Sequence, residues 1–443
     1  MKNLLTVLLV LTIVLTAGAQ IKETNDLNGR WYLTFDLPDS IYRGVFAFEK
    51  GEAGTIKTTT LSEPFLFLTG GSFVGDQIKL QGKSDYGNVQ IAATIENNKI
   101  KGTWTLGFIN GAVIGEREPA DKARTDYNIV FTVVWRTINE KFYDPNFNGM
   151  DWQAIGDKYR PQIVKAASDT EFISNMRAML KELKVSHTGF YYSPFEELIT
   201  PKKVADNKSV NILKVINWKR LSPAVGYLQI KEFAEGPEII AEIDRAFANL
   251  GDAPNLIIDL RGNSGGTLGV GMRLGDYLFA KMQTVGFFAS REGLKRFNAK
   301  SVSDLPVTKL PIYSGYSVTE FWTELDKTGA LAIAAGGRGG QTYKGKVVIL
   351  ADENCASTTE GVLAVLKETR RATLIGRKSR GAILSAVAVK AAGNWSVRYP
   401  KADYRTPNNQ KIEGVGVEPD IKVEKVGGKD ADLERALAFL QTH

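Results

Sequence analysis

The 443-residue chain has few of the side chains that bind metal ions or form disulfides. It contains one cysteine, Cys355, and two histidines, His187 and the C-terminal His443. A single cysteine excludes an intramolecular disulfide framework and a metal site built from cysteines. Two histidines leave little for a histidine-rich metal centre. The sequence therefore indicates neither a metal nor another cofactor.

Clustered positive charge is absent as well, although the formal net charge is +7, from 56 Lys and Arg against 49 Asp and Glu. The basic residues form no dense run with interleaved aromatic residues, so a nucleic-acid partner is not indicated. With 43% hydrophobic and 24% charged residues, the composition is that of an ordinary folded protein. At roughly 100–200 residues per domain, the length predicts two to four domains.

Long apolar runs are missing except near the start of the chain. Residues 4–15 are an almost unbroken apolar stretch, preceded by Lys2 and followed by Ala17-Gly18-Ala19. This is the pattern of a secretory signal peptide, residues 1–19, with cleavage after Ala19. The alternative, a membrane anchor, needs roughly 20 apolar residues, and this stretch is shorter. We therefore expect an exported protein, periplasmic or extracellular, with no stable membrane span after cleavage.

Residues 20–118 have the pattern of a small β-rich module. Short runs of alternating apolar and polar residues are separated by glycine and Asn/Asp turns, which is typical of an antiparallel β-barrel or sandwich. Trp31 and Trp104 are expected in its core rather than against a ligand. The strand candidates are residues 30–35, 44–48, 77–80, 89–95 and 100–104.

Residues 119–204 change to a helical period. Apolar residues recur at spacings of three and four, which predicts amphipathic helices that pack as a helical subdomain. One such face holds Val130, Val133, Val134 and Ile138, and another holds Phe172, Met176, Met179, Leu180 and Leu183.

Residues 205–427 alternate between strands and helices, which predicts an α/β core. Continuous apolar runs at 255–260 and 346–350 are typical of strands buried on both faces of a parallel sheet. The segment 267–345 is too long for a plain connection, so it is interpreted as an insertion that forms a lid or a substrate wall. Further strands are expected at 225–230 and 372–375, and helices at 237–250, at 358–369 and within 428–443.

Three places carry residues that could perform chemistry, and the first is Ser186-His187-Thr188, just after a predicted helix. An isolated histidine is more often structural than catalytic, and that interpretation stays open here. However, His187 is the only histidine away from the chain end. An imidazole base would therefore have to be His187.

The second place is Ser357, between a buried strand and the next helix. Its hydroxyl would lie at the carboxyl edge of a parallel sheet and at the positive end of a helix dipole, where an oxyanion is stabilised. The alternative is structural, because Ser357 and Glu360 also fit a helix capping box. The neighbouring Cys355 could be a thiol nucleophile, although a free cysteine is usually a small buried apolar residue.

The third place is the loop that follows the strand at 255–260 and contains Gly262, Gly265 and Gly266. Exposed backbone N–H groups in such a loop suit an anion or an oxyanion. The loop lacks the Lys-Ser/Thr ending of a phosphate-binding P-loop and the glycine order of a dinucleotide fold. A nucleotide site is therefore not expected.

Together these motifs resemble those of the C-terminal-processing (tail-specific) serine peptidases, and more closely their tricorn-like branch. The resemblance covers roughly residues 125–425. The segments that carry it, in the family order, are Ser186-His187-Thr188, Tyr227-Leu228-Gln229-Ile230, Asp259-Leu260-Arg261-Gly262-Asn263-Ser264-Gly265-Gly266, Ser357-Thr358-Thr359-Glu360 and Glu413-Gly414-Val415-Gly416-Val417-Glu418-Pro419-Asp420.

The resemblance implies an α/β crotonase-like (ClpP-like) core that hydrolyses a peptide or protein substrate through an acyl-enzyme. The residues that it implies are Ser357 as nucleophile, His187 as general base, Ser186 and Glu413 as the groups that orient the imidazole, and Gly265, Gly266 and Thr358 as oxyanion donors.

Two features of the wider family pattern are missing. In the processing-protease branch a lysine follows the glycine after the next strand, but Ala382 stands there, and Lys378 precedes that glycine. The sequence therefore favours a serine–histidine arrangement over a serine–lysine dyad. The stretch between Phe190 and Val225 is too short for an inserted PDZ domain, so recognition of a free carboxyl terminus is not expected from this part of the pattern.

Two other functions stay open. The chain could be a catalytically inactive binding or carrier protein on the same core, in which Ser357 is only a helix cap. Alternatively, the module at 20–118 could be the functional part and bind a cell-envelope or small apolar ligand.

Overall fold

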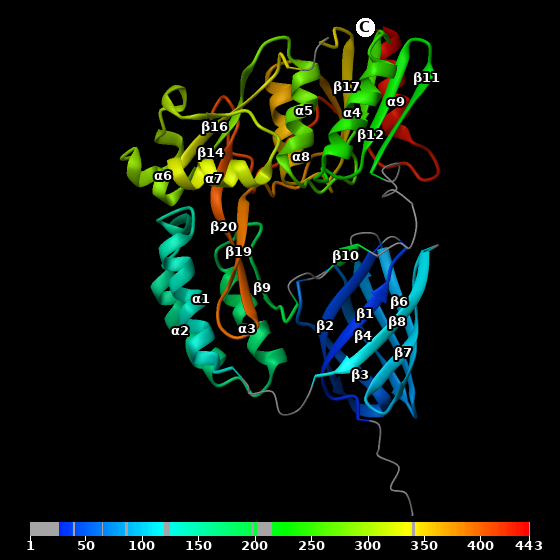
Figure 1. Ribbon diagram of the computed structural model, residues 1–443, viewed down its shortest axis with the longest axis vertical. Coiled ribbons are helices and arrows are strands. Elements are labelled where there is room, and N and C mark those ends of the chain that lie inside the picture. Colours follow the sequence, from blue (N-terminus) through cyan, green and yellow to red (C-terminus); the bar gives the residue numbers. More distant parts are fainter. Residues whose placement is uncertain are drawn as a thin grey trace, which may run out of the picture.

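The computed structural model describes residues 26–38, 40–63, 65–84, 87–107, 109–118, 125–195, 199–201, 215–338 and 342–442. The expected signal peptide, residues 1–19, lies outside the described residues. Three regions are visible in Figure 1: a β-barrel at the lower right, a group of helices at the lower left and a mixed α/β region above them. No helix in the described ranges is long and apolar enough to cross a membrane.

The N-terminal module is a closed barrel, which decides between the two architectures left open by the sequence. Each strand pairs antiparallel with the next, and β1 pairs with both β2 and β8, so the sheet closes on itself. A short strand, β10 (Ile199–Pro201), adds to β2. The barrel strands are β1 (Gly29–Asp36), β2 (Ser40–Lys50), β3 (Thr55–Thr60), β4 (Phe67–Val74), β5 (Gln77–Ser84), β6 (Gly87–Glu96), β7 (Lys99–Leu106) and β8 (Ile109–Arg117).

The interior of the barrel is a packed apolar core. Trp31 and Trp104 are buried in it, as expected, and the other inward-facing side chains join them in one cluster. Strands β3, β4 and β8 were not predicted from the sequence, because β3 has one apolar residue and so no alternating pattern, and the other two are interrupted by glycines. Barrel closure supplies the hydrogen-bond partners that make these weak segments strands.

The helical subdomain consists of α1 (Tyr127–Lys141), α2 (Trp152–Val164) and α3 (Asp169–Lys181). Each helix begins after a side chain that accepts a backbone N–H: Asp126, Asp151 and Ser168. Such N-caps satisfy donors that the first helical turn leaves unpaired. The predicted apolar faces are buried, except that Val133 is only half-buried.

The barrel is bonded to the strand that follows α3, β9 (Gly189–Tyr192). The N–H of Tyr192 donates to the Leu61 carbonyl at 2.6 Å. The Arg177 guanidinium joins the two parts, because it donates to the carbonyls of Phe190 (2.9 Å) and Thr60 (3.0 Å). The position of β9 is thus tied to the barrel on one side and to α3 on the other.

The α/β region contains a first sheet with the order β11-β12-β13-β17-β18-β21, parallel apart from the β11–β12 pair. Helices α4 (Pro237–Leu250), α5 (Leu268–Leu278) and α8 (Thr358–Glu368) pack on one face, and α9 (Ala431–Thr442) packs on the other. The strands are β11 (Ile216–Ser222), β12 (Val225–Ile230), β13 (Asn255–Asp259), β17 (Lys346–Ala351), β18 (Thr373–Gly376) and β21 (Ile421–Lys422).

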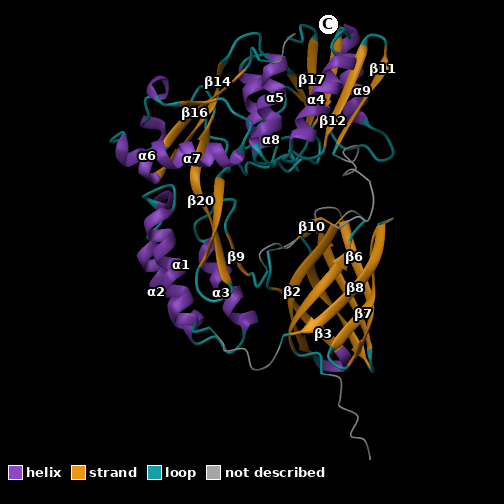
Figure 2. Ribbon diagram, in the orientation of Figure 1, coloured by secondary structure: helices purple, strands orange, loops and turns teal. Residues whose placement is uncertain are grey.

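A second sheet stands beside the first: its strands are yellow-green and orange in Figure 1, and all strands are orange in Figure 2. Its order is β15-β16-β14-β20-β19, and β9 pairs with the far end of β20. The segment 267–345 therefore supplies three of its strands, together with α6 (Arg291–Arg296) and α7 (Val318–Thr328). The strands are β14 (Gln283–Ser290), β15 (Ile312–Tyr313), β16 (Ala330–Ala335), β19 (Ser385–Lys390) and β20 (Trp395–Arg405).

Candidate active site

His187 lies in the tight turn between α3 and β9, next to the side chain of Ser186. The Ser186 hydroxyl is 2.7 Å from His187 Nδ1. His187 has a φ of +58°, a backbone conformation that residues other than glycine adopt rarely and at some cost. This conformation is held by the elements on both sides of the turn, α3 and β9.

Glu413 follows β20 in the chain, and its side chain contacts Ser186 in this turn. Its buried carboxylate accepts the Ser186 N–H on Oε1 (2.7 Å) and the Ser186 hydroxyl on Oε2 (2.9 Å). Oε2 also accepts the N–H of Ile383 at 2.9 Å. All three neighbouring groups are donors, so both oxygens of this buried carboxyl group act as acceptors.

The direction of these bonds assigns the proton on the imidazole. The Ser186 hydroxyl has a single proton, which it donates to Glu413. Its oxygen must then accept a hydrogen bond from His187 Nδ1–H, since the two atoms are 2.7 Å apart. Nε2 of His187 is therefore left without a proton and can accept one.

Two charges and burial act on the imidazole. Burial, the largest effect, lowers the pKa of His187 because it disfavours the charged ring; Glu413 raises that pKa and Arg380 lowers it. The net pKa is below the ordinary value. The ring is therefore neutral at neutral pH.

Ser357 lies at the sharp turn between β17 and α8, with φ +57° and ψ −131°. The capping box, which was the structural alternative for Ser357, does not form, because the Ser357 side chain caps no N–H group of α8. The buried Glu360 carboxylate instead accepts the N–H groups of Gly381 (2.6 Å) and Ala382 (2.7 Å). Within the described ranges, the Ser357 hydroxyl has no hydrogen-bond partner, so it is not used by the helix.

One peptide unit joins the serine to the histidine side of the site. The Ser357 N–H donates to the Ala382 carbonyl at 2.7 Å. The next N–H, that of Ile383, donates to Glu413. The strained serine turn and the Glu413–Ser186–His187 chain thus meet across the Ala382–Ile383 peptide. Residues separated by up to 227 positions in sequence are brought into one place.

The glycine loop passes directly beside Ser357. A Cβ atom added to Gly265 would lie 2.6 Å from Ser357 Cβ, so only glycine fits there. The Gly265 N–H, however, donates to Asn263 Oδ1 at 2.9 Å and is occupied. The N–H groups of Gly266 and Thr358 have no acceptor among the described residues, and the Thr358 hydroxyl donates to the Gly266 carbonyl at 2.7 Å.

The other candidate nucleophile and base have different surroundings. Cys355 is fully buried, its thiol points to the Leu260 carbonyl at 3.1 Å, and burial raises its pKa far above the ordinary value. A thiol that stays protonated is a poor nucleophile. Lys378 is exposed and forms an ion pair with Glu418 (3.1 Å), and Ala382 contributes only its backbone to the serine turn.

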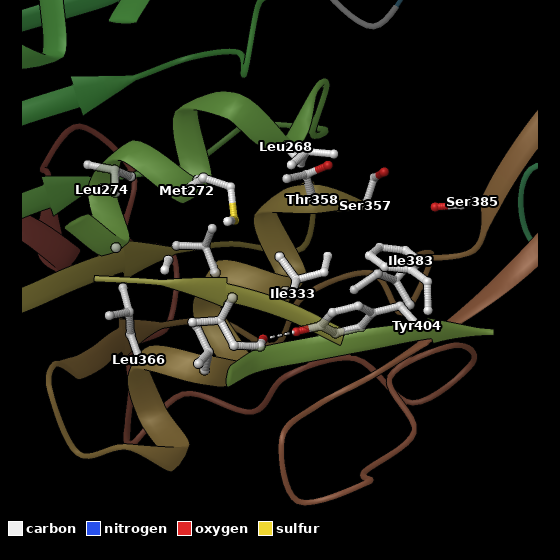
Figure 3. A pocket seen from close by; sticks show the side chains of 18 of the residues that line it. Leu268, Met272, Leu274, Ile333, Ser357, Thr358, Leu366, Ile383, Ser385 and Tyr404 are labelled. Atoms are coloured by element: carbon white, nitrogen blue, oxygen red, sulfur yellow. Dashed lines mark hydrogen bonds between the residues drawn. The ribbon is translucent and has the colours of Figure 1, made fainter. Parts of the chain in front are cut away.

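An apolar pocket opens beside Ser357 between α5, α8 and the second sheet (Figure 3). Ser357, Thr358 and Ser385 lie at one end of the pocket, and Leu274 and Leu366 lie at the other. The ring of Tyr404 faces the pocket, and its hydroxyl donates to the Val285 carbonyl at 2.8 Å. Further lining residues are Leu268, Met272, Ile333 and Ile383. The segment 267–345 thus provides one wall of this pocket.

Two residues that organise the site were missed by the sequence analysis. Asn263 is fully buried and links the glycine loop to the serine turn, because it accepts from Thr359 Oγ1 (2.9 Å) and its carbonyl accepts the Ala356 N–H (3.2 Å). Glu360 holds the segment around Ala382, as described above. Asn263 and Glu360 both lie within motif segments, 259–266 and 357–360. A motif alone does not distinguish a side chain that positions the site from one that reacts.

No group of three or more side chains able to hold a metal ion occurs within the described part of the chain. The residues gathered here instead form a serine, imidazole and carboxylate set with free N–H groups. Comparison with known proteins agrees with this composition. Residues 224–423 match the profile of peptidase family S41, and residues 123–181 match that of the tricorn protease C1 domain.

The chain carries a peptidase family S41 domain. This S41 domain includes the glycine loop, Ser357 and Glu413, whereas Ser186 and His187 lie between the two matched regions. The observed structure therefore completes the site from outside the S41 domain.

Several relatives share this region. The chain is 25% identical over 223 residues to the carboxy-terminal-processing protease of Bartonella bacilliformis, an alignment covering 48% of this chain and 42% of that protein. It is 23% identical over 223 residues to the carboxyl-terminal-processing protease of Picosynechococcus, covering 48% and 44%. The chain thus spans less than half the length of these two relatives. A solved structure from Parabacteroides merdae shares the fold, with a TM-score of 0.53 and 20% identity, covering 72% of this chain and 97% of that one.

Proposed function

We propose that this chain is a serine peptidase that uses Ser357 as nucleophile and His187 as general base. The observation that carries the proposal is the hydrogen-bonded chain from Glu413 through Ser186 to His187 Nδ1, which leaves Nε2 as a proton acceptor. It meets a serine turn whose hydroxyl caps no helix and whose backbone is strained. Strain of this kind is retained mainly where function requires it.

In the acylation step, Ser357 Oγ bonds to the carbonyl carbon of the substrate while its proton moves to His187 Nε2. The π electrons of the carbonyl move to its oxygen, which becomes an oxyanion. When the C–N bond breaks, the oxyanion returns to a carbonyl and the proton on Nε2 goes to the leaving amine. Water then repeats the sequence on the acyl-enzyme and restores Ser357.

Ser186 and Glu413 stabilise the imidazolium that forms in both steps. The positive ring donates from Nδ1 to Ser186, which passes the polarisation to the Glu413 carboxylate. The N–H groups of Gly266 and Thr358 are assigned to the oxyanion, and the Gly265 N–H is left out because Asn263 occupies it. One such donor usually contributes roughly 3–4 kcal/mol in the transition state.

The substrate is a peptide or protein, and the apolar pocket is assigned to the side chain that precedes the cut. Its lining of aliphatic and aromatic carbon suits a residue such as leucine. The fold of the two sheets is assigned to the crotonase-like class, and export is inferred from the N-terminal apolar stretch. The names of the two processing proteases support a role in limited proteolysis.

The alternatives are less well supported. A carrier protein on this core would use Ser357 as a helix cap, and that bond is not formed. A barrel that binds a small ligand would need internal space, whereas the inward side chains of the described barrel residues pack against one another. The free hydroxyl supports the peptidase proposal, and the filled barrel counts against a ligand-binding barrel.

Fluorophosphonate labelling with intact-mass spectrometry tests the proposal, together with digestion of a peptide library. Wild type should gain one adduct and should cut after apolar residues. Ser357→Ala and His187→Ala should gain no adduct and should not cut, while circular dichroism shows both variants folded. Ser264→Ala, in the glycine loop beside Ser357 but outside the assigned machinery, is the matched control and should label like wild type. Labelling of Ser357→Ala would refute the nucleophile assignment.

A further inference from the structure

Arg380 stands on the segment that holds the serine turn in place. Its N–H donates to the Cys355 carbonyl at 2.9 Å, and two residues later the Ala382 carbonyl accepts the Ser357 N–H. Residues 380 and 382 therefore lie opposite residues 355 and 357. The backbone of Arg380 is thus fixed beside the proposed nucleophile, while its side chain is exposed.

The backbone on both sides of Arg380 is held by one buried group. The Glu360 carboxylate accepts the Ser379 hydroxyl (2.5 Å) and the Gly381 N–H (2.6 Å). The Ser379 oxygen in turn accepts the Val417 N–H at 2.7 Å. The guanidinium can therefore move only by rotation of its own side chain, which keeps its charge near the site.

The guanidinium of Arg380 has no protein partner within the described part of the chain. The neighbouring cations on the same segment do: Arg377 pairs with Glu353 (2.8 Å) and Lys378 pairs with Glu418 (3.1 Å). Glu413 is already engaged by Ser186 and Ile383. An arginine presents five donors in a planar fork, which matches a carboxylate.

The charge of Arg380 opposes the chemistry proposed for His187. It lowers the pKa of His187 and so disfavours the imidazolium that must form during both steps. An anion bound to the guanidinium would compensate its charge and relieve this effect. Arg380 thus disfavours the His187 imidazolium when no anion is bound to its guanidinium, and this effect is relieved when an anion binds. Such a cation is suited to recognising a negatively charged substrate.

We propose that Arg380 is a specificity-determining residue that binds a carboxylate on the leaving-group side of the substrate. The inference rests on the proposed peptidase function. His187 must reach the leaving amine, so groups beside the imidazole face that side of the cut. The apolar pocket, which Arg380 does not line, takes the other side. The carboxylate belongs either to an Asp or Glu side chain or to the free C-terminus of the substrate.

Four peptides with the same leucine before the cut test this assignment. The first pair ends in a C-terminal amide and differs in one residue of the leaving segment, which is Glu in one peptide and Gln in the other. The second pair carries Gln at that position and differs in the group at its end, a few residues after the cut, which is a free carboxylate in one peptide and an amide in the other. The carboxylate member of at least one pair should have a kcat/KM roughly 10- to 100-fold higher, as expected for a bond between charged groups. The pair that responds identifies the source of the carboxylate.

The variants separate recognition from a structural effect. Arg380→Gln should bring the ratio within each pair close to one, Arg380→Lys should restore part of it, and Lys378→Gln should leave it as in wild type. In Arg380→Gln the acid limb of kcat/KM for the uncharged peptides should also move to higher pH, because the cation that lowers the pKa of His187 is gone.

Equal rates for all four peptides in wild type, or a preference that persists in Arg380→Gln, would overturn the assignment of Arg380. If wild type also labels with fluorophosphonate, the proposed function stands and only the specificity assignment fails. Absence of both cleavage and labelling would refute the proposed function, and the Arg380 assignment with it.

Discussion

Replacement of Glu413 by glutamine tests the hydrogen-bonded chain behind the proposed base. The carboxylate accepts three bonds, from the N–H and hydroxyl of Ser186 and from the N–H of Ile383. A glutamine side chain has one acceptor oxygen, and its NH2 group only donates. Glu413→Gln therefore removes the negative charge and leaves at least one buried donor facing another donor.

The size of the effect follows from these contacts. A hydrogen bond to a charged group contributes about 1.5–3 kcal/mol, and an unsatisfied buried donor costs about 1–3 kcal/mol. Because Glu413 acts on the imidazole through Ser186, only part of this sum reaches the transition state. We expect a loss of about 3–4 kcal/mol, which is a roughly 100- to 1000-fold lower kcat.

Steady-state kinetics with a fluorogenic peptide checks this expectation. KM should change little, because Glu413 does not contact the substrate in the proposed mechanism. Glu413 raises the pKa of His187, so its neutralisation lowers that pKa and moves the acid limb of kcat/KM to lower pH. A lower kcat and a shifted acid limb together would show that Glu413 acts on His187 and does not merely stabilise the fold.

Glu418→Gln is the matched control, since Glu418 is five residues away, exposed, and paired with Lys378 and Lys422. It should leave kcat, KM and the pH profile as in wild type. A folded Glu413→Gln variant with the kcat of wild type, or with its whole loss in KM, would refute the assignment of Glu413 to the catalytic chain.

Two further predictions follow from the same geometry. Burial and the charge of Arg380 outweigh Glu413 and hold the pKa of His187 below its ordinary value. The kcat/KM of wild type should therefore rise with pH and reach half its plateau below about pH 6.5. A midpoint above that value would contradict a buried neutral base. Ser357→Gly should be inactive, because it lacks the hydroxyl. Ser357 has a φ of +57°, which glycine adopts freely, so the free energy of unfolding of Ser357→Gly should be roughly 1 kcal/mol higher than that of Ser357→Ala. Equal stability of the two variants would show that the serine turn stores no strain.

Local structure was largely predictable from the sequence. Strand β12 and helix α4 have the expected bounds, and α8 and β13 differ by a residue at one end. Their apolar spacing reports directly which face of each element is buried, and burial is what makes the element form. The second sheet was not foreseen, because β14 pairs with β20 more than a hundred residues later, and no local pattern records that pairing.

The choice of site residues shows the same division. With one internal histidine, the sequence alone determined that any imidazole base is His187, and alanine rather than lysine at position 382 favours a histidine base over a lysine base. The sequence left the role of Ser357 undecided between a cap and a nucleophile. In the structure its side chain caps no N–H group of α8, its backbone has φ +57° and ψ −131°, and its N–H bonds to Ala382 in a distant segment.

Only the tertiary structure decided how the site residues meet. Ser186 and Glu413 are 227 residues apart, and they are brought together because the strand after His187, β9, pairs with β20, the strand that precedes Glu413. The Ser357 N–H likewise bonds to Ala382, 25 residues later, and which acidic groups surround the exposed Arg380 among the described residues also depends on packing between distant parts of the chain. Sequence periodicity determines which side chains are buried, since burial is a property of each element; hydrogen bonding in the site depends on long-range packing, since it requires atoms from several elements within about 3 Å of one another.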